Sequence, residues 1–164
     1  MQKAVFLDRD GVINHDPGDY TKNVDEFHFL PGLFDTLRLI NAYGFEIIVV
    51  TNQGGIARGI YSLQDFKKTD AFMHKRFREE HIRVMPTFFC PHHELAGKCL
   101  CRKPKSLLVE RAIARYQISA ADSVFVGDKE RDIDCAEGAG VRGILIPTNA
   151  LLENYLHLFV KNNV

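Results

Sequence analysis

The sequence predicts an α/β fold, a doubly wound parallel sheet with helices packed on both faces. Two observations support it: short apolar runs rich in Val, Ile and Phe recur along the chain, and segments with helical spacing of apolar residues separate them. Strands that alternate with helices pair most economically as a parallel sheet with right-handed connections. At 164 residues the chain has the size of one compact domain, so we expect a single domain over residues 1–164.

The expected strands are the apolar runs that are too short to be helices. They lie at residues 4–7, 45–50, 85–89, 123–126 and 143–146. Runs of this length and composition are typical of strands that are buried on both faces.

The first two expected helices show clear start or stop signals. Apolar residues from Leu33 to Ile40 share one face, and Gly44 follows at a position suited to a C-cap. The second helix runs from Ser62 to about Ile82 and opens with a capping-box-like spacing of Ser62 and Asp65.

Three further helices are expected in the second half of the chain. One begins after Ser106, and the next contains Ile133 and Ala136 and is closed by Gly138 and Gly140. The segment 151–160 has the pattern of a final amphipathic helix that packs back on the domain.

Composition excludes several classes of function. Lys plus Arg and Asp plus Glu both number 21, so the net charge is zero and no basic face is available for nucleic acid. The apolar run before Asp8 is too short for a signal peptide, and no run is long enough to span a bilayer. We therefore expect a cytoplasmic monomer with no nucleic-acid or membrane partner.

Two carboxylates follow the first expected strand, at the sheet edge where open α/β folds bind ligands. Asp8 and Asp10 stand two residues apart, and Gly11 lets the chain turn sharply. One carboxylate can attack phosphorus while the other transfers a proton. Taken alone, the D-x-D-G pattern is equally well explained as a solvated turn.

Three more polar groups follow other expected strands or loops. Thr51 offers a hydroxyl that can hold phosphoryl oxygens, Lys103 can neutralise their charge, and Asp128 supplies a further carboxylate. Two of them have a plainer explanation when taken singly: a cap or turn for Thr51, and a solvated basic pair with Arg102 for Lys103.

Taken together, four sequence blocks resemble the haloacid dehalogenase superfamily of phosphohydrolases. They are F-L-D-R-D-G at Phe6 to Gly11, V-V-T-N-Q at Val49 to Gln53, C-R-K-P at Cys101 to Pro104 and V-G-D-K-E-R-D at Val126 to Asp132. Their order and spacing span nearly the entire chain and are far more specific than any single block. By this resemblance, Asp8 is the nucleophile and forms an aspartyl phosphate, and Asp10 protonates the leaving alcohol and then activates water. Thr51 and Lys103 would stabilise the transferring phosphoryl group.

The same resemblance implies a catalytic Mg²⁺. Asp8, the backbone carbonyl of Asp10 and Asp128 would hold it, in keeping with the preference of Mg²⁺ for hard oxygen ligands. The role of Asp132 stays open, because the corresponding acid often orients a water or a lysine instead.

Members of this superfamily often carry a cap domain inserted after the first or the second block, and neither interval is long enough here. We therefore expect an open site in which loops position the substrate. The residues expected to bind it are Asp16, Gly18, Asp19, Tyr20, Thr51, Asn52, Gln53, Gly54, Arg102, Lys103 and Lys129.

A cluster of cysteine and histidine predicts a second metal. Cys90, His92, Cys99 and Cys101 can form a closed tetrahedral Zn²⁺ site, which would be structural because it leaves no open position for water. On spacing alone, His93 is an alternative fourth ligand; similarity to the C-P-H pattern of the heptose bisphosphate and histidinol phosphatase branch favours His92. By contrast, Cys135 has the pattern of a small core residue.

Resemblance to that branch also suggests the substrate. The run I-A-R-G at Ile56 to Gly59 resembles the heptose enzymes, so D-glycero-D-manno-heptose 1,7-bisphosphate, cleaved at its 7-phosphate in nucleotide-heptose synthesis, is expected ahead of histidinol phosphate. The six residues between His92 and Cys99 make a short loop, which is nearer to the histidinol branch and to some heptose enzymes with compact loops. Arg58, Arg102 and Lys129 are the cations expected near a second phosphate. A non-enzymatic zinc-loop binding module would explain the cysteines but would leave the carboxylates without a purpose.

Overall fold

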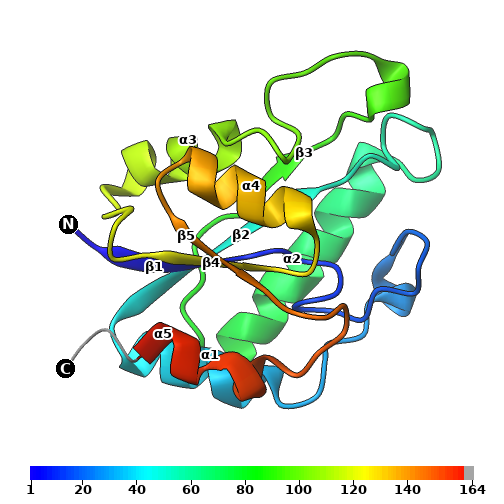
Figure 1. Ribbon diagram of the computed structural model, residues 1–164. Helices are drawn as coiled ribbons and strands as arrows, with labels where there is room; N and C mark the ends of the chain where they lie inside the picture. Colours follow the sequence, from blue (N-terminus) through cyan, green and yellow to red (C-terminus); the bar gives the residue numbers. More distant parts are fainter. Residues whose placement is uncertain (161–164) are drawn as a thin grey trace.

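A computed structural model describes residues 1–160 of the chain. Its centre is a five-stranded sheet in which every neighbouring pair of strands is parallel, in the order β3-β2-β1-β4-β5 (Figure 1). The strands are β1 (Lys3–Leu7), β2 (Phe45–Asn52), β3 (Phe88–Cys90), β4 (Val124–Gly127) and β5 (Arg142–Leu145). The predicted α/β fold is confirmed.

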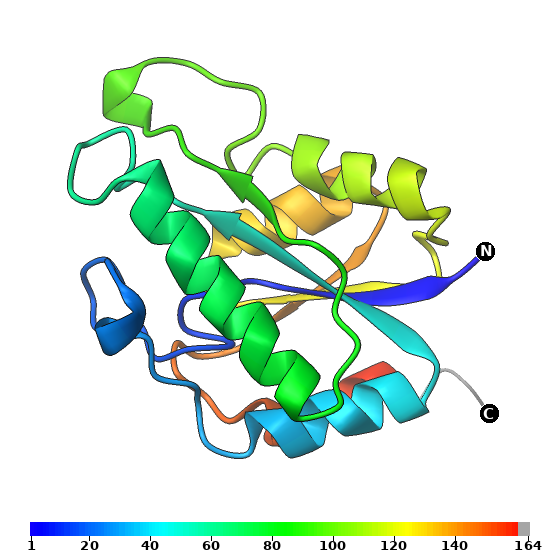
Figure 2. The same cartoon turned by 180° about the vertical axis from the view of Figure 1, so that it is seen from behind.

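Helices cover both faces of this sheet, as a doubly wound fold requires (Figures 1 and 2). They are α1 (Leu33–Ala42), α2 (Leu63–Glu79), α3 (Leu107–Tyr116), α4 (Glu130–Gly138) and α5 (His157–Val160), with short 3₁₀ turns η1 (Val24–Glu26), η2 (Glu94–Ala96) and η3 (Leu152–Tyr155). Leu37 of α1 and Met73 of α2 pack with Val5 on one face, and Val109 of α3 and Ala136 of α4 pack with Phe6 on the other. Alternation of side chains along β1 thus serves two separate apolar cores.

The predicted helix caps of α1 and α2 are confirmed, but several helix and strand boundaries differ from those expected. Ser62 and Asp65 form the expected capping box, and Gly44 has a φ of 80° immediately after the C-cap residue of α1. The third strand was expected at 85–89 but spans Phe88–Cys90, because Pro86 has no N–H for the ladder. The second helix ends at Glu79 rather than near Ile82.

The C-terminal segment also differs from the expected single helix over 151–160. It forms the 3₁₀ turn η3 and then the one-turn helix α5, separated at Leu156. This break brings both Leu152 and Phe159 into the apolar core beneath α1.

The strand order places the ends of β1, β2 and β4 next to one another. The chain leaves β1 toward β2 on one side and later returns to β4 on the other, which is the switch point where open α/β sheets bind ligands. In the described chain, the connection after β1 holds η1 and α1 and the connection after β2 holds α2, with loops between them, so no cap domain is inserted there. No helix within residues 1–160 is long and apolar enough to cross a membrane.

Candidate active site

Asp8, the first residue after β1, lies against the Lys103 side chain. Lys103 Nζ is 2.9 Å from Asp8 Oδ1 and 2.7 Å from Asp132 Oδ1, and it donates to the Val50 carbonyl at 2.9 Å. Burial and the charge of Asp132 raise the pKa of Asp8 to about 7, against the lowering effect of Lys103. Burial also lowers the pKa of Lys103, but the two carboxylates more than reverse this and leave it raised. Lys103 is therefore a fixed cation beside the expected nucleophile.

Asp10, the second carboxylate, is held by three side chains. Arg9 contacts both of its oxygens, at 2.9 and 3.0 Å, Asn14 Nδ2 donates to Oδ1 at 3.0 Å, and Gln53 Nε2 donates to Oδ2 at 3.1 Å. Burial alone would raise the pKa of Asp10. The charge of Arg9 and these hydrogen bonds outweigh that effect and leave the pKa below its ordinary value. The carboxylate is thus ionised and oriented before substrate arrives.

Thr51, near the end of β2, is fully buried and shares a partner with Asp10. Its Oγ1 accepts a hydrogen bond from Gln53 Nε2 at 2.9 Å. Gln53 was expected to contact substrate, and the structure buries its side chain between Thr51, Asp10 and the hydroxyl of Tyr61.

Three carboxylates form the group best suited to Mg²⁺. Ligand oxygens of Asp8, Asp128 and Asp132 lie within 4.8 Å of one another, and all three residues are buried. Asp128 Oδ2 accepts from Thr148 Oγ1 at 2.6 Å, whereas Asp128 Oδ1 is buried and has no hydrogen-bond partner among the described residues. A buried oxygen without a partner and a cluster of hard donors fit a divalent cation. A Cβ on Gly11 would lie 2.5 Å from Asp128 Oδ2, so glycine is needed there.

Asp132, whose role the sequence left open, orients a lysine. Its Oδ1 pairs with Lys103, while its Oδ2 accepts from the Lys129 N–H at 3.1 Å and so caps α4. Lys129 Nζ lies 3.2 Å from Asp128 Oδ2 and donates to Thr148.

The Asn52 side chain, expected to bind substrate, instead forms hydrogen bonds with the Lys103 main chain. Its Oδ1 accepts from the Lys103 N–H at 3.0 Å and its Nδ2 donates to the Lys103 carbonyl at 3.2 Å. Arg102 extends from the same segment and donates from Nη1 to the His92 carbonyl at 3.2 Å. Gly54 lies directly beneath, since a Cβ there would come within 3.1 Å of Arg102 Nη1.

The loop after β1 carries the other expected substrate contacts. Asp16 Oδ1 accepts from the Gly18 N–H at 2.9 Å, and Asp19 pairs with Lys22 at the surface. The Tyr20 hydroxyl accepts from Arg58 Nη1 at 3.2 Å, which links this loop to the one after β2. The loops after β1, β2 and β3 gather at one end of the sheet (Figures 1 and 2).

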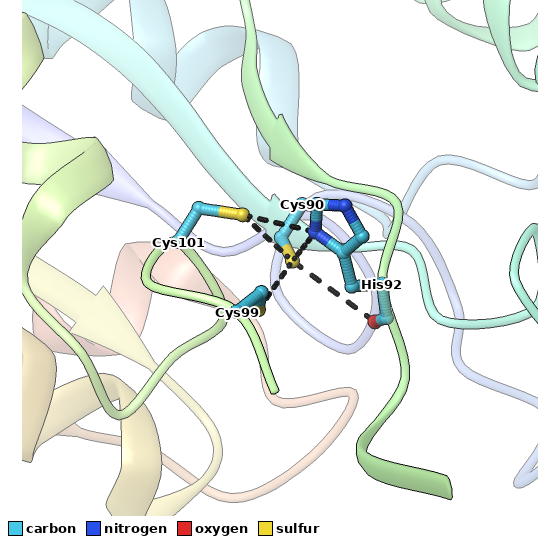
Figure 3. Close-up of side chains that lie close together, drawn as sticks. All are labelled: Cys90, His92, Cys99 and Cys101. Carbon is cyan, nitrogen blue, oxygen red and sulfur yellow. Dashed lines mark hydrogen bonds between the residues drawn. The ribbon is translucent and has the colours of Figure 1, made fainter. Parts of the chain in front are cut away.

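The Cys/His cluster forms a compact group, with its side chains directed toward one another (Figure 3). Sγ of Cys90 lies 3.8 Å from that of Cys99 and 3.2 Å from that of Cys101, and His92 Nδ1 lies 3.2 Å from Cys101 Sγ. A tetrahedron with metal–sulfur bonds of about 2.3 Å has sulfur–sulfur edges of roughly 3.8 Å. The Cys90–Cys99 distance has this length and the Cys90–Cys101 distance is shorter, and the set of three thiols and one imidazole is of the kind that binds Zn²⁺. His93 lies outside it, with its Nδ1 accepting from the Leu95 N–H.

Sequence reasoning did not assign roles to several residues that shape the site. Arg9 is buried against the rings of Phe27 and Phe66 while it holds Asp10. A lone arginine between two site carboxylates was the available signal. No local pattern pointed to the remaining ones: Asn14 and Tyr61, whose partners are described above, Thr148, and Asn149, which exchanges two hydrogen bonds with the Asp16 main chain.

Comparisons with known proteins agree with this geometry. Residues 100–157 match the HAD-hydrolase-like family model. Over 90% of its length the chain is 39% identical to the D-glycero-beta-D-manno-heptose-1,7-bisphosphate 7-phosphatase of Haemophilus influenzae, 83% of which is covered. The chain belongs to this phosphatase family. Another member, the D-glycero-alpha-D-manno-heptose-1,7-bisphosphate 7-phosphatase of Photorhabdus laumondii, is 36% identical over 97% of this chain and 95% of that protein.

Among solved structures, a member of the same family has a closely similar fold. The D,D-heptose 1,7-bisphosphate phosphatase of B. bronchiseptica, crystallised with magnesium and phosphate, has a TM-score of 0.83 and 33% identity, over 90% of this chain and 82% of that one. As a family member, the protein is a phosphatase, and the resemblance to the haloacid dehalogenase superfamily is confirmed.

Proposed function

We propose that this protein is a Mg²⁺-dependent phosphatase that removes the 7-phosphate of D-glycero-D-manno-heptose 1,7-bisphosphate, in the synthesis of nucleotide-activated heptose. The observation that carries the substrate is similarity, at 36–41% identity, to relatives named for this reaction. The cluster of Asp8, Asp10 and Lys103 at the switch point supports the chemistry.

In the first step, an Asp8 carboxylate oxygen bonds to phosphorus while the bond from phosphorus to the bridging oxygen breaks, and Asp10 gives its proton to the departing alkoxide. In the second step, water gives a proton to Asp10 and attacks phosphorus, which breaks the Asp8–phosphorus bond and releases inorganic phosphate. The Thr51 hydroxyl and the Lys103 ammonium stabilise charge on the phosphoryl oxygens.

Asp10 must carry a proton in the first step, although its surroundings favour the ionised form. Arg9, Asn14 and Gln53 lower its pKa before substrate arrives. A phosphate dianion that enters beside Asp10 is a like charge and raises that pKa, so substrate binding favours the acid form. The ionised form is restored for the hydrolytic step.

Mg²⁺ would be held by Asp8, the Asp10 carbonyl and Asp128, and when bound it neutralises charge on the phosphoryl group. Zn²⁺ would be held by Cys90, His92, Cys99 and Cys101 as a structural metal that fixes the loop preceding Arg102. The buried, unpaired Asp128 Oδ1 supports the first assignment and the close packing of the thiols the second.

The second phosphate of the substrate has a basic pocket available. A pocket of about 350 Å³ adjoins Lys103, and its lining includes the cations of Lys98, Arg102 and Lys105 against the single carboxylate of Glu94. Arg102 lies nearest to the site along the chain and carries a planar fork suited to phosphate. We expect it to favour the bisphosphate over substrates with one phosphate.

Phosphate release from a panel of metabolites tests the substrate. Heptose 1,7-bisphosphate should be hydrolysed with far higher kcat/KM than histidinol phosphate, and Arg102→Ala should reduce this preference through a higher KM for the bisphosphate. The control is Arg111→Ala, which alters an exposed arginine on α3. Equal or better efficiency on histidinol phosphate would reassign the substrate and leave the phosphatase chemistry in place.

The remaining expectations form part of the same proposal. We expect the chain to act as a single-domain, cytoplasmic monomer whose partner is a small phosphorylated metabolite. Light scattering coupled to size-exclusion chromatography tests the monomer, and a mass of twice 18.7 kDa would contradict it.

A further inference from the structure

The Gln53 amide uses every one of its hydrogen-bonding groups on the active site. Nε2 donates to Asp10 Oδ2 at 3.1 Å and to Thr51 Oγ1 at 2.9 Å, and Oε1 accepts from the Tyr61 hydroxyl at 2.5 Å. Only 1% of Gln53 is exposed. One buried side chain therefore connects the expected acid and base to the expected phosphoryl-binding hydroxyl.

Only one orientation of this amide satisfies its neighbours. A flipped amide would place Oε1 against the ionised carboxylate of Asp10, where two acceptors would meet, and would leave the NH₂ group facing Tyr61. In the observed orientation Thr51 Oγ1 accepts a hydrogen bond from Gln53 Nε2, and the Thr51 hydroxyl itself donates to the Asn52 carbonyl at 3.5 Å.

Tyr61 supplies the donor that fixes the Oε1 end. It is buried at the end of the loop after β2, and a Cβ on Gly55 would lie 2.2 Å from its ring, so the glycine makes room for it. Burial raises the pKa of Tyr61 above its ordinary value, so the hydroxyl retains its proton. The Tyr20 ring packs edge-on against it with centroids 5.9 Å apart.

We infer that Tyr61 is a positioning residue for Asp10, which it orients through the amide of Gln53. This inference rests on the proposed function, because it assigns Asp10 the proton transfer to the leaving group. Tyr61 itself touches neither reacting group and does no chemistry.

The expected consequence depends on the leaving group. A sugar alkoxide needs a proton from Asp10 as it departs, whereas p-nitrophenolate leaves without one. Loss of the hydrogen bond from the Tyr61 hydroxyl to Gln53 Oε1 should therefore slow hydrolysis of the sugar phosphate more than hydrolysis of p-nitrophenyl phosphate. A merely structural defect would slow both equally.

The experiment measures kcat and KM of Tyr61→Phe with heptose 1,7-bisphosphate and with p-nitrophenyl phosphate in saturating Mg²⁺. We expect kcat/KM, which reports phosphoryl transfer to Asp8, to fall about tenfold for the bisphosphate and less than about twofold for the aryl phosphate. Tyr43→Phe, which alters a half-exposed tyrosine just after α1, is the matched control and should leave both substrates unaffected.

A double-mutant cycle with Gln53→Met tests whether the effect passes through the amide. Once Gln53 is replaced, Tyr61→Phe should cause no further differential loss. Equal losses on both substrates, or additive effects in the cycle, would overturn the inference. If Tyr61→Phe does not fold, Gln53→Met alone must show the same leaving-group dependence.

Failure of the proposed substrate can be separated from failure of this inference. If the wild-type protein does not hydrolyse the bisphosphate, the substrate proposal fails, and phenyl phosphate compared with p-nitrophenyl phosphate supplies the leaving-group series. If the wild type hydrolyses the bisphosphate but the variant shows no leaving-group dependence, only the inference fails.

Discussion

Lys103 shows how a single buried cation depends on its neighbours. Its side chain is 1% exposed, and its ammonium is surrounded by Asp8, Asp132 and the Val50 carbonyl. An ammonium buried without partners would lose its proton, but two carboxylates keep this one charged. Because two acids share it, Lys103 stays paired when either one is changed.

This sharing makes Asp8→Asn a clean test of the nucleophile. The amide keeps the shape of the carboxylate but does not attack phosphorus, so kcat should fall by about four orders of magnitude or more. Folding should persist, because Lys103 keeps Asp132 as its partner. Phosphate release and circular dichroism measure the two effects, with Asp134→Asn on the exposed side of α4 as control. Appreciable turnover by Asp8→Asn would remove Asp8 from this role.

Magnesium binding should depend on pH through Asp8. Burial raises the pKa of this group to about 7 in the metal-free protein, so protons compete with Mg²⁺ below that pH. Affinity should weaken by up to about tenfold per pH unit as pH falls below 7, and should level off above it. Calorimetric titrations at pH 6 and pH 8 measure this, and equal affinities at both would contradict it.

The same shift affects stability with a defined sign. A raised acid pKa means that the metal-free folded chain binds more protons than the unfolded chain between the ordinary value of 3.8 and about 7. The contribution of Asp8 to stability is therefore present at low pH and is lost as pH rises through this window.

The residues expected to carry the chemistry lie in short motifs, whereas the residues that hold them do not. Asp8, Asp10 and Lys103 belong to blocks whose order predicts their roles, and the structure brings Asp8 and Lys103 together. Tyr61 and Asn149 act through partners 8 and 133 positions away, so only the folded arrangement of loops reveals them. Asn52 was expected to face substrate, yet its amide binds the Lys103 main chain. The direction of this side chain depends on the folded position of Lys103, which the local sequence does not reveal.

At the level of elements, the loop between β3 and Lys103 depends on its Cys/His cluster. Within it, η2 is the sole helical element that the structure describes, and Leu95 and Leu100 are largely exposed. Few apolar contacts hold such a loop, so a metal bound to four of its side chains would supply most of its order.

A pair of adjacent histidines gives a sharp test of zinc. Purified protein should contain about one Zn²⁺ per chain; His92→Ala should lose it and His93→Ala should keep it, because only His92 lies with the thiols. Metal analysis and thermal unfolding measure both. We expect His92→Ala to lower Tm without changing the concentration of Mg²⁺ needed for activity. Zinc loss in His93→Ala alone would reverse the assignment, and absence of zinc in the wild type would refute the site.

Boundaries of elements were less predictable than their order. The apolar runs predicted the strands, but they do not show that β3 begins only at Phe88, after Pro86. Likewise, the apolar pattern of 151–160 fits a helix, while the observed turn at Leu156 lets two buried residues reach one core. Tertiary packing decides such details.

At the level of the whole molecule, one sheet joins both apolar cores, so the chain should unfold in one step. Because Mg²⁺ with inorganic phosphate would bind only the folded site, saturation at about 100 times Kd should stabilise it by about 2.7 kcal/mol. For a chain of this size this corresponds to a rise in Tm of roughly 5–10 °C. Scanning calorimetry measures the shift, and Asp128→Asn should abolish it. Two separate transitions would contradict the single domain.

The hydrogen bonds between Asn52 and the main chain of Lys103 have a consequence for the evolution of specificity. This amide ties Lys103 to the end of β2 directly, so the lysine does not depend on the intervening loop for its register. Insertions, deletions or exchanges within residues 93–98, between His92 and Cys99 of the Cys/His cluster, can then alter what the enzyme accepts while the lysine stays in place. We therefore expect this loop to be exchangeable, so that loops from related phosphatases can be grafted onto this scaffold to obtain new substrate ranges.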